Sequence, residues 1–152
     1  MPEHIGSWHP LIAHPSRALR LYRNGLRFVW LVRRHPISDV FKRASSDPSF
    51  RMTVAAPEDP LALAELADRI FRRALFPFPN RCLVKSLAVF SALHPTCPDL
   101  KLVIGLRKAP GRSSAPVDGH AWLTLGGRVL SDLDRHAPEA FGATLVLGDD
   151  RP

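Results

Sequence analysis

Three residues in the second half of this 152-residue chain carry side chains suited to acyl chemistry. Cys82 stands at the start of an apolar segment, where we expect a helix to begin. At a helix N-terminus, unpaired N–H groups and the positive end of the helix dipole favour a thiolate. His120 and Asp132 lie on opposite arms of a predicted β-hairpin. A thiolate, an imidazole and a carboxylate in this chain order suggest a nucleophile, a base and an orienting acid.

The identity of the acid depends on the register of the hairpin, because Asp134 competes with Asp132. A strict two-residue turn at residues 126–127 would face Asp132 away from His120, since side chains alternate along a strand. A bulge that lengthens the turn by one residue would place Asp132 diagonal to His120 on the same face. The mechanism requires the second geometry for Asp132, and we therefore predict the bulged register.

Helical periodicity and capping residues predict the N-terminal half of the fold. Residues 16–35 form a basic amphipathic helix, with an expected apolar stripe made of Leu19, Tyr22, Leu26, Trp30 and Val32. Residues 36–57 have the composition of a loop. Asp59 and Pro60 signal the start of a helix that runs to Leu75. Asn80 is expected to cap a further helix over residues 81–93, whose scarcity of polar residues indicates burial on most sides.

The C-terminal half has the pattern of an antiparallel sheet. Short β-rich runs lie at residues 102–106, 120–125, 128–131 and 143–147, and the pair Gly126-Gly127 is a strong hairpin signal. Helices followed by an antiparallel sheet indicate the α+β class.

Charge divides the chain into two parts. Residues 1–51 hold nine Lys and Arg against three Asp and Glu, out of 21 basic and 14 acidic residues in the chain. We therefore distinguish a basic N-terminal helical arm and loop, residues 1–55, from a catalytic domain, residues 56–152. The arm could contact nucleic acid, an anionic membrane or an acidic protein. Apolar residues make up 45% of the chain, which excludes wholesale disorder.

The sequence lacks the pattern of a secretory signal, and its two cysteines allow at most one disulfide. The cytoplasm, with both thiols reduced, is therefore the expected location. We expect no nucleotide site, because Gly126-Gly127 is explained by the hairpin. Cys97 lies in a proline-bounded loop. The spacing of five residues between His4, His9 and His14, interrupted by Pro10 and Pro15, argues against a metal site.

Four short motifs resemble the lasso-peptide B proteins, the transglutaminase-like cysteine proteases that remove the leader from a lasso-peptide precursor. The motifs are CLVKSL at 82–87, LVIGLR at 102–107, HAW at 120–122 and GRVLSD at 127–132. The resemblance covers about residues 59–147. It implies a transglutaminase/papain-like core, in which a buried nucleophile helix packs on an antiparallel sheet. By position, Cys82 matches the nucleophile, His120 the base and Asp132 the orienting acid, without a cofactor or a metal.

The resemblance also implies partners. A stand-alone peptidase of this family acts on the lasso precursor peptide together with a separate winged-helix leader-binding protein, and passes the core peptide to an ATP-dependent cyclase. The basic arm is then expected to serve a protein partner, a transporter or a peripheral membrane contact rather than nucleic acid. Thr124 and Ser131 depart from the family pattern beside the site. Two alternatives remain open: another transglutaminase-like acyl transferase or amidase, and a basic non-catalytic binding module in which Cys82 is structural.

Overall fold

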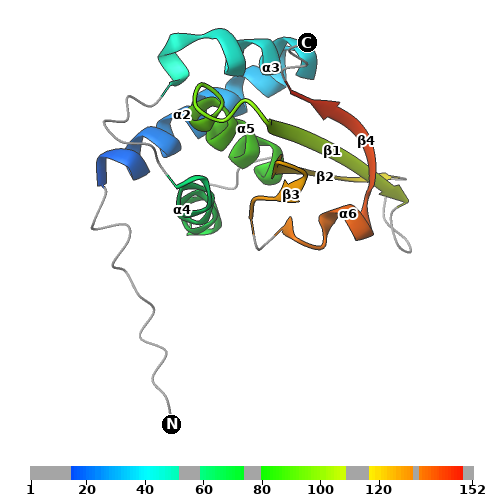
Figure 1. Cartoon of the computed structure of the whole chain (residues 1–152). Coiled ribbons are helices and arrows are strands. Elements are labelled where there is room, and N and C mark those ends of the chain that lie inside the picture. The colour runs from blue at the N-terminus through cyan, green and yellow to red at the C-terminus, as the bar shows by residue number, and fades with distance from the viewer. Residues whose placement is uncertain (1–14, 52–58, 74–79, 109–116, 132–133, 149–152) are drawn as a thin grey trace.

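The computed structural model describes residues 15–51, 59–73, 80–108, 117–131 and 134–148. Helices come first and an antiparallel sheet follows, with the short helix α6 inserted before the last strand (Figure 1). The helical elements are α2 (Pro15–Arg34), α3 (Ile37–Ser46), the 3-10 helix η1 (Pro48–Phe50), α4 (Pro60–Arg73), α5 (Arg81–Leu93) and α6 (Ala137–Ala140). The strands are β1 (Leu100–Lys108), β2 (Val117–Leu125), β3 (Arg128–Val129) and β4 (Gly142–Leu147), in the spatial order β3-β2-β1-β4. The predicted α+β class is confirmed.

Helix α5 is the centre of the molecule. It contacts α2, α3 and α4 on one side and strands β1 and β2 on the other. Val84, Leu87 and Phe90 are fully buried, which confirms the expectation of an almost wholly buried helix. Asn80 does occupy the N-cap position, but it adopts the left-handed conformation with a φ of 53°, and its side chain makes no capping hydrogen bond. Its carbonyl instead accepts a hydrogen bond from the N–H of Val84.

The N-terminal helices belong to the same core as α5, so the core extends across the expected boundary at residue 55. Leu21 and Phe28 of α2 and Val40 of α3 are fully buried in it. The prediction of a loop over residues 36–57 is wrong where the structure describes it, because Val40 and Ala44, one turn apart, bury one face of a helix. The predicted stripe on α2 is wrong for three of its five residues: Leu19, Leu26 and Trp30 are 68%, 45% and 51% exposed. Its other two residues, Tyr22 and Val32, are partly buried and pack against the core.

The buried face of α2 is set by a close contact with α4. A Cβ placed on Gly25 would lie 2.5 Å from the ring of Phe71. Only glycine therefore allows α2 to approach α4 this closely. The helix buries the face that carries Leu21, Gly25 and Phe28 rather than the face that carries Leu19 and Trp30.

The hairpin between β2 and β3 has the strict two-residue turn. Leu125 pairs with Arg128 and Thr124 with Val129, so the predicted bulged register is wrong. Gly126 and Gly127 have φ values of 56° and 80°, as a type I′ turn requires, and its twist matches that of the flanking strands without an additional residue. β3 ends after two residues. Among the described residues, no strand pairs with the other edge of β2 before Leu123, so that edge is open there.

Candidate active site

The open edge of β2 receives the N-terminal half of α5. Along an antiparallel strand, residues two apart direct both backbone groups to the same side. The carbonyl of Leu123 accepts the N–H of Leu130 on the β3 side, so the backbone groups of Ala121 face that side too, where β3 no longer reaches. The carbonyl of Ala121 accepts a hydrogen bond of 3.2 Å from Ser86 Oγ, and its N–H donates to the sulfur of Cys82. The end of β3 thus makes room for the nucleophile helix beside the strand.

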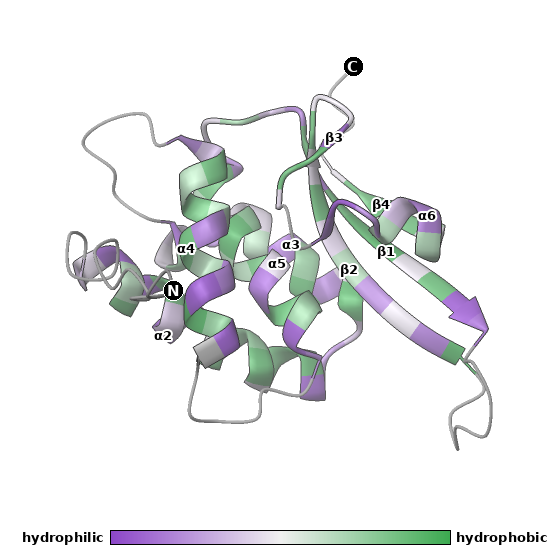
Figure 2. Cartoon of the chain, turned by 90° about the horizontal axis from the view of Figure 1, so that it is seen from below, coloured by the Kyte–Doolittle hydropathy of each residue, from purple (hydrophilic) through white to green (hydrophobic). Residues whose placement is uncertain are grey.

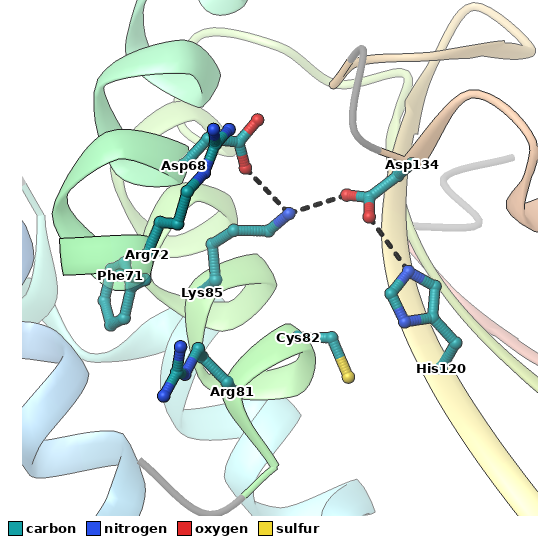
Figure 3. Close-up of a pocket in the computed structure, with 8 residues that line it drawn as sticks. All are labelled: Asp68, Phe71, Arg72, Arg81, Cys82, Lys85, His120 and Asp134. Carbon is teal, nitrogen blue, oxygen red and sulfur yellow. Dashed lines mark hydrogen bonds and ion pairs between the residues drawn. The ribbon is translucent and has the colours of Figure 1, made fainter. Parts of the chain in front are cut away.

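Cys82 and His120 face each other in a cavity of about 330 Å³ between α4, α5 and β2 (Figure 3). Cys82 lies in the first turn of α5, where the helix dipole favours negative charge. The described residues that line the cavity are Asp68, Phe71, Arg72, Arg81, Cys82, Lys85, His120 and Asp134. In Figure 3 the Nδ1 atom of His120 is the ring nitrogen nearer to the sulfur. The structure therefore brings together the cysteine and the histidine that the sequence indicated.

The two side chains stabilise each other in their charged forms. Burial raises the pKa of the Cys82 thiol, but a hydrogen bond with His120, a hydrogen bond from the Ala121 N–H and the imidazolium charge outweigh it, and the net pKa is lowered. The hydrogen bond with Asp134, followed by that with Cys82, raises the pKa of His120 to about 9. Both shifts favour the pair of a thiolate and an imidazolium, which is the reactive form of a cysteine nucleophile.

Among the described residues, the carboxylate in contact with His120 is that of Asp134. Its Oδ1 lies 2.9 Å from Nε2 of the imidazole. Burial raises the pKa of Asp134, but the hydrogen bond with His120 and the charge of Lys85 lower it by more, so the net pKa is lowered. The carboxylate is therefore ionised and accepts a hydrogen bond from Nε2–H. Asp132, which the sequence indicated as the acid, lies outside the described residues. The bulged register on which that prediction rested does not form.

A buried cation supports the far side of Asp134. Lys85 Nζ lies 2.7 Å from Asp134 Oδ2 and 2.8 Å from Asp68 Oδ1. Ser131 Oγ donates to the second oxygen of Asp68 at 2.5 Å. The carboxylates of Asp68 and Asp134 are only 7% and 4% exposed, so the charges of this network depend on one another.

The sequence pattern did contain a signal for Asp68, which the sequence interpretation missed. Asp68 stands on the apolar side of α4, one turn after Ala64 and next to Ala67, both buried. A carboxylate on the buried side of an amphipathic helix requires a partner of opposite charge. That partner is Lys85, which lies three residues after Cys82 on α5.

Aromatic rings hold the other side of the imidazole. The ring centroids of Phe141 and Trp122 lie 5.2 Å and 6.1 Å from that of His120. Trp122 is 1% exposed and packs with Val103 and Ala137 on the face of the sheet opposite α5. A Cβ on Gly105 would lie 2.7 Å from the Trp122 ring, so glycine is required where β1 passes beneath it.

The remaining candidate residues lie away from this cavity or outside the described residues. Cys97 lies next to Thr96, whose hydroxyl is 3.8 Å from its sulfur. His136 pairs with Glu139 on the exposed surface at 3.6 Å. His4, His9 and His14 lie outside the described residues. Within the described ranges, no group of three or more His, Cys, Asp and Glu side chains could hold a metal ion, and no helix could cross a membrane.

Comparison with known families places this geometry in context. Residues 24–145 match the family described as the transglutaminase-like superfamily. The chain belongs to the transglutaminase-like superfamily. The match begins within α2 and ends within β4, so it covers the nucleophile helix, the sheet and the N-terminal helices that pack on them. No curated protein and no solved structure matches the chain. Members of the transglutaminase-like superfamily are typically enzymes, among them cysteine proteases and acyl transferases.

Proposed function

We propose that this transglutaminase-like protein is a cysteine endopeptidase that removes the leader from a lasso-peptide precursor in the cytoplasm. The observation that carries the proposal is the contact series from Cys82 through His120 to Asp134 in one cavity. Three of the motifs that resemble lasso-peptide B proteins lie on elements of this site: 82–87 on α5, 120–122 on β2, and 127–132 in the segment that leads to Asp134.

The geometry supports amide hydrolysis in two steps. The Cys82 thiolate attacks the carbonyl carbon at the leader–core junction and forms a C–S bond. As the tetrahedral intermediate collapses, Nδ1 of the His120 imidazolium gives its proton to the leaving amine, and the C–N bond breaks. Water then attacks the thioester, the imidazole takes a proton from that water, and cleavage of the C–S bond restores the thiolate. The backbone N–H of Cys82, at the start of α5, is the proposed donor to the oxyanion.

The proposed partners are the precursor peptide, a separate winged-helix leader-binding protein and an ATP-dependent cyclase. The described residues 15–51 are helical, whereas a winged-helix module requires strands as well. The exposed side of α2 provides a surface for a partner. It presents Leu19, Leu26 and Trp30 beside the exposed basic residues Arg20 and Arg23. Exposed apolar side chains among basic residues are suited to an acidic protein surface.

The decisive experiment incubates the purified protein with a lasso precursor and its leader-binding protein and analyses the products by mass spectrometry. Cleavage at one bond with uptake of one water supports the peptidase, whereas a product that carries an amine in place of water indicates acyl transfer. Cys82→Ala should abolish product formation. Cys97→Ala is the matched control, because Cys97 lies outside the cavity, and should cleave at the wild-type rate. An inactive Cys97→Ala with an active Cys82→Ala would overturn the assignment.

A further inference from the structure

We propose that the open edge of β2 binds the substrate as an additional antiparallel strand, and that Gly119 is the residue that pairs with it. The inference rests on the proposed peptidase function and defines how its substrate is held. The ligand class is an extended, unfolded peptide segment rather than a folded protein surface. Such strand addition uses main-chain hydrogen bonds for affinity and pockets at alternate positions for selectivity.

The backbone pattern of β2 leads to Gly119. Leu123 faces β3, and Ala121, two residues earlier, faces α5 on the same side. Gly119 is the next residue with this orientation. Its residue position is exposed, and among the described residues no backbone or side-chain group bonds to its N–H or carbonyl on that side. One donor and one acceptor are thus available to a single residue of an incoming strand.

The spacing between these edge positions fits the chemistry. Ala121 contacts the sulfur of Cys82 through its N–H. Two residues of a strand span about 6.6 Å, which is the distance along β2 from Ala121 to Gly119. The peptide residue that pairs with Gly119 therefore neighbours, in the peptide, the residue whose carbonyl meets the sulfur. Pairing at Gly119 would therefore bring the scissile carbonyl to Cys82 in a defined register.

The surface around Gly119 suits an apolar peptide. Gly119 pairs with Leu106 of β1, and a Cβ on Gly119 would lie 3.4 Å from the Leu106 side chain. Leu106 and Val117 are 44% and 49% exposed, and both lie on the face of the sheet that α5 covers farther along. In Figure 2 this end of β1 and β2 extends beyond the helices. The two side chains form an apolar floor next to the open edge, because Gly119 contributes no side chain that would cover it.

The test compares alkylation of Cys82 by two reagents. Iodoacetamide reports only the thiolate, whereas the peptide reagent acetyl-Ala-Ala-Gly chloromethyl ketone also engages the edge. Gly119→Pro removes the edge N–H without removing a bond of the sheet, since proline is tolerated where a strand N–H faces outward. We expect the peptide reagent to react about tenfold more slowly with this variant, as the loss of about one hydrogen bond implies, while the iodoacetamide rate is retained. Gly119→Ala keeps the N–H, so its rate of reaction with the peptide reagent should fall less than threefold.

A second measurement uses the wild-type protein and keeps the inference falsifiable if Gly119→Pro folds poorly. Peptide reagents with a single N-methyl group at successive positions are compared. Successive N–H groups of a strand point to opposite sides. Methylation of the N–H that faces β2 should therefore slow alkylation about tenfold, whereas methylation at the adjacent peptide positions should not. Equal rates for all the methylated reagents, or a full peptide rate in a folded Gly119→Pro variant, would overturn strand pairing. Neither result depends on cleavage of a lasso precursor, whose failure would instead overturn the proposed function.

Discussion

Asp134 lies 2.9 Å from the Nε2 atom of His120, and this contact orients the imidazole so that its Nδ1 atom is the nitrogen nearer to Cys82. The contact joins two segments that are 14 residues apart in sequence. Asp134 enters the site from a short turn in which its own N–H donates to the carbonyl of Ser131 at 3.0 Å. The position of the acid is therefore set by the turn that follows β3, and not by a position within the strand.

The first prediction concerns the pH dependence of cleavage. Because the pKa of His120 is raised to about 9, the imidazolium persists through neutral pH, and kcat/KM should decrease as the pH rises through about 9. Asp134→Asn removes the largest cause of this shift, so the alkaline limb should move toward the ordinary histidine pKa of about 6.5, and kcat/KM at pH 7.5 should fall about 10-fold or more.

The control for this prediction is Asp132→Asn, whose alkaline limb should stay near pH 9, with kcat/KM within a few-fold of the wild type. Each variant replaces one carboxyl group of the wild type by an amide, and both pH profiles are measured with the same peptide substrate. If Asp132→Asn moves the limb and Asp134→Asn leaves it in place, then Asp132 is the orienting acid.

The second prediction concerns Lys85. Lys85→Met removes the cation between two buried carboxylates, and the free energy of unfolding should fall by about 3–5 kcal/mol, the usual cost of breaking a buried ion pair. The pKa of Asp134 should also rise, since the Lys85 charge is one of its lowering influences. Urea denaturation measures the first effect, and the acid limb of the cleavage profile, displaced to higher pH, measures the second.

Lys101→Met is the matched control for Lys85→Met. Lys101 is exposed on β1, so its replacement should change the unfolding free energy by less than about 0.5 kcal/mol. Equal stability of the two methionine variants would contradict a role for Lys85 in holding the two carboxylates.

The third prediction concerns the contact between α2 and α4. Gly25→Ala places a methyl group 2.5 Å from the Phe71 ring, and overpacking of this kind should lower the free energy of unfolding by about 1–3 kcal/mol. Phe71→Leu removes the ring atoms that cause the clash. In the double variant the two losses should therefore be less than additive, as measured by urea denaturation. Additive losses would show that Gly25 does not act through Phe71.

The fourth prediction concerns the exposed side of α2. Charge reversal at Arg20 and Arg23 should slow processing of a precursor presented by its leader-binding protein, and the defect should depend on salt concentration. Iodoacetamide alkylation of Cys82 should stay at the wild-type rate. Arg27 is unsuitable for this test, because its guanidinium hydrogen-bonds Ser49 at 2.8 Å and lies 4.0 Å from the centre of the Phe50 ring.

Arg128→Glu on β3 is the control reversal for the α2 experiment, because Arg128 is exposed on a strand of the sheet and not on α2. It should leave processing unchanged. Equal defects from the two reversals would indicate a general effect of net charge rather than a partner surface on α2.

Local signals in the sequence determined the elements and two of the site residues. Periodicity, proline and glycine mark α2, α4, α5 and the Gly126-Gly127 turn, because helix propensity, capping and positive φ depend on residues close in the chain. The same local information places Cys82 at a helix start and His120 in a strand.

Tertiary packing decided which face each element buries and which acid reaches the imidazole. α2 carries apolar residues on more than one side, and the fit of Gly25 against Phe71 selects the buried one. In the same way, the early end of β3 and the turn after Ser131 bring Asp134 to His120, and Lys85 joins it to Asp68 on another helix. These contacts join segments distant in the chain, and their free energy depends on burial and mutual distance, which sequence spacing does not encode.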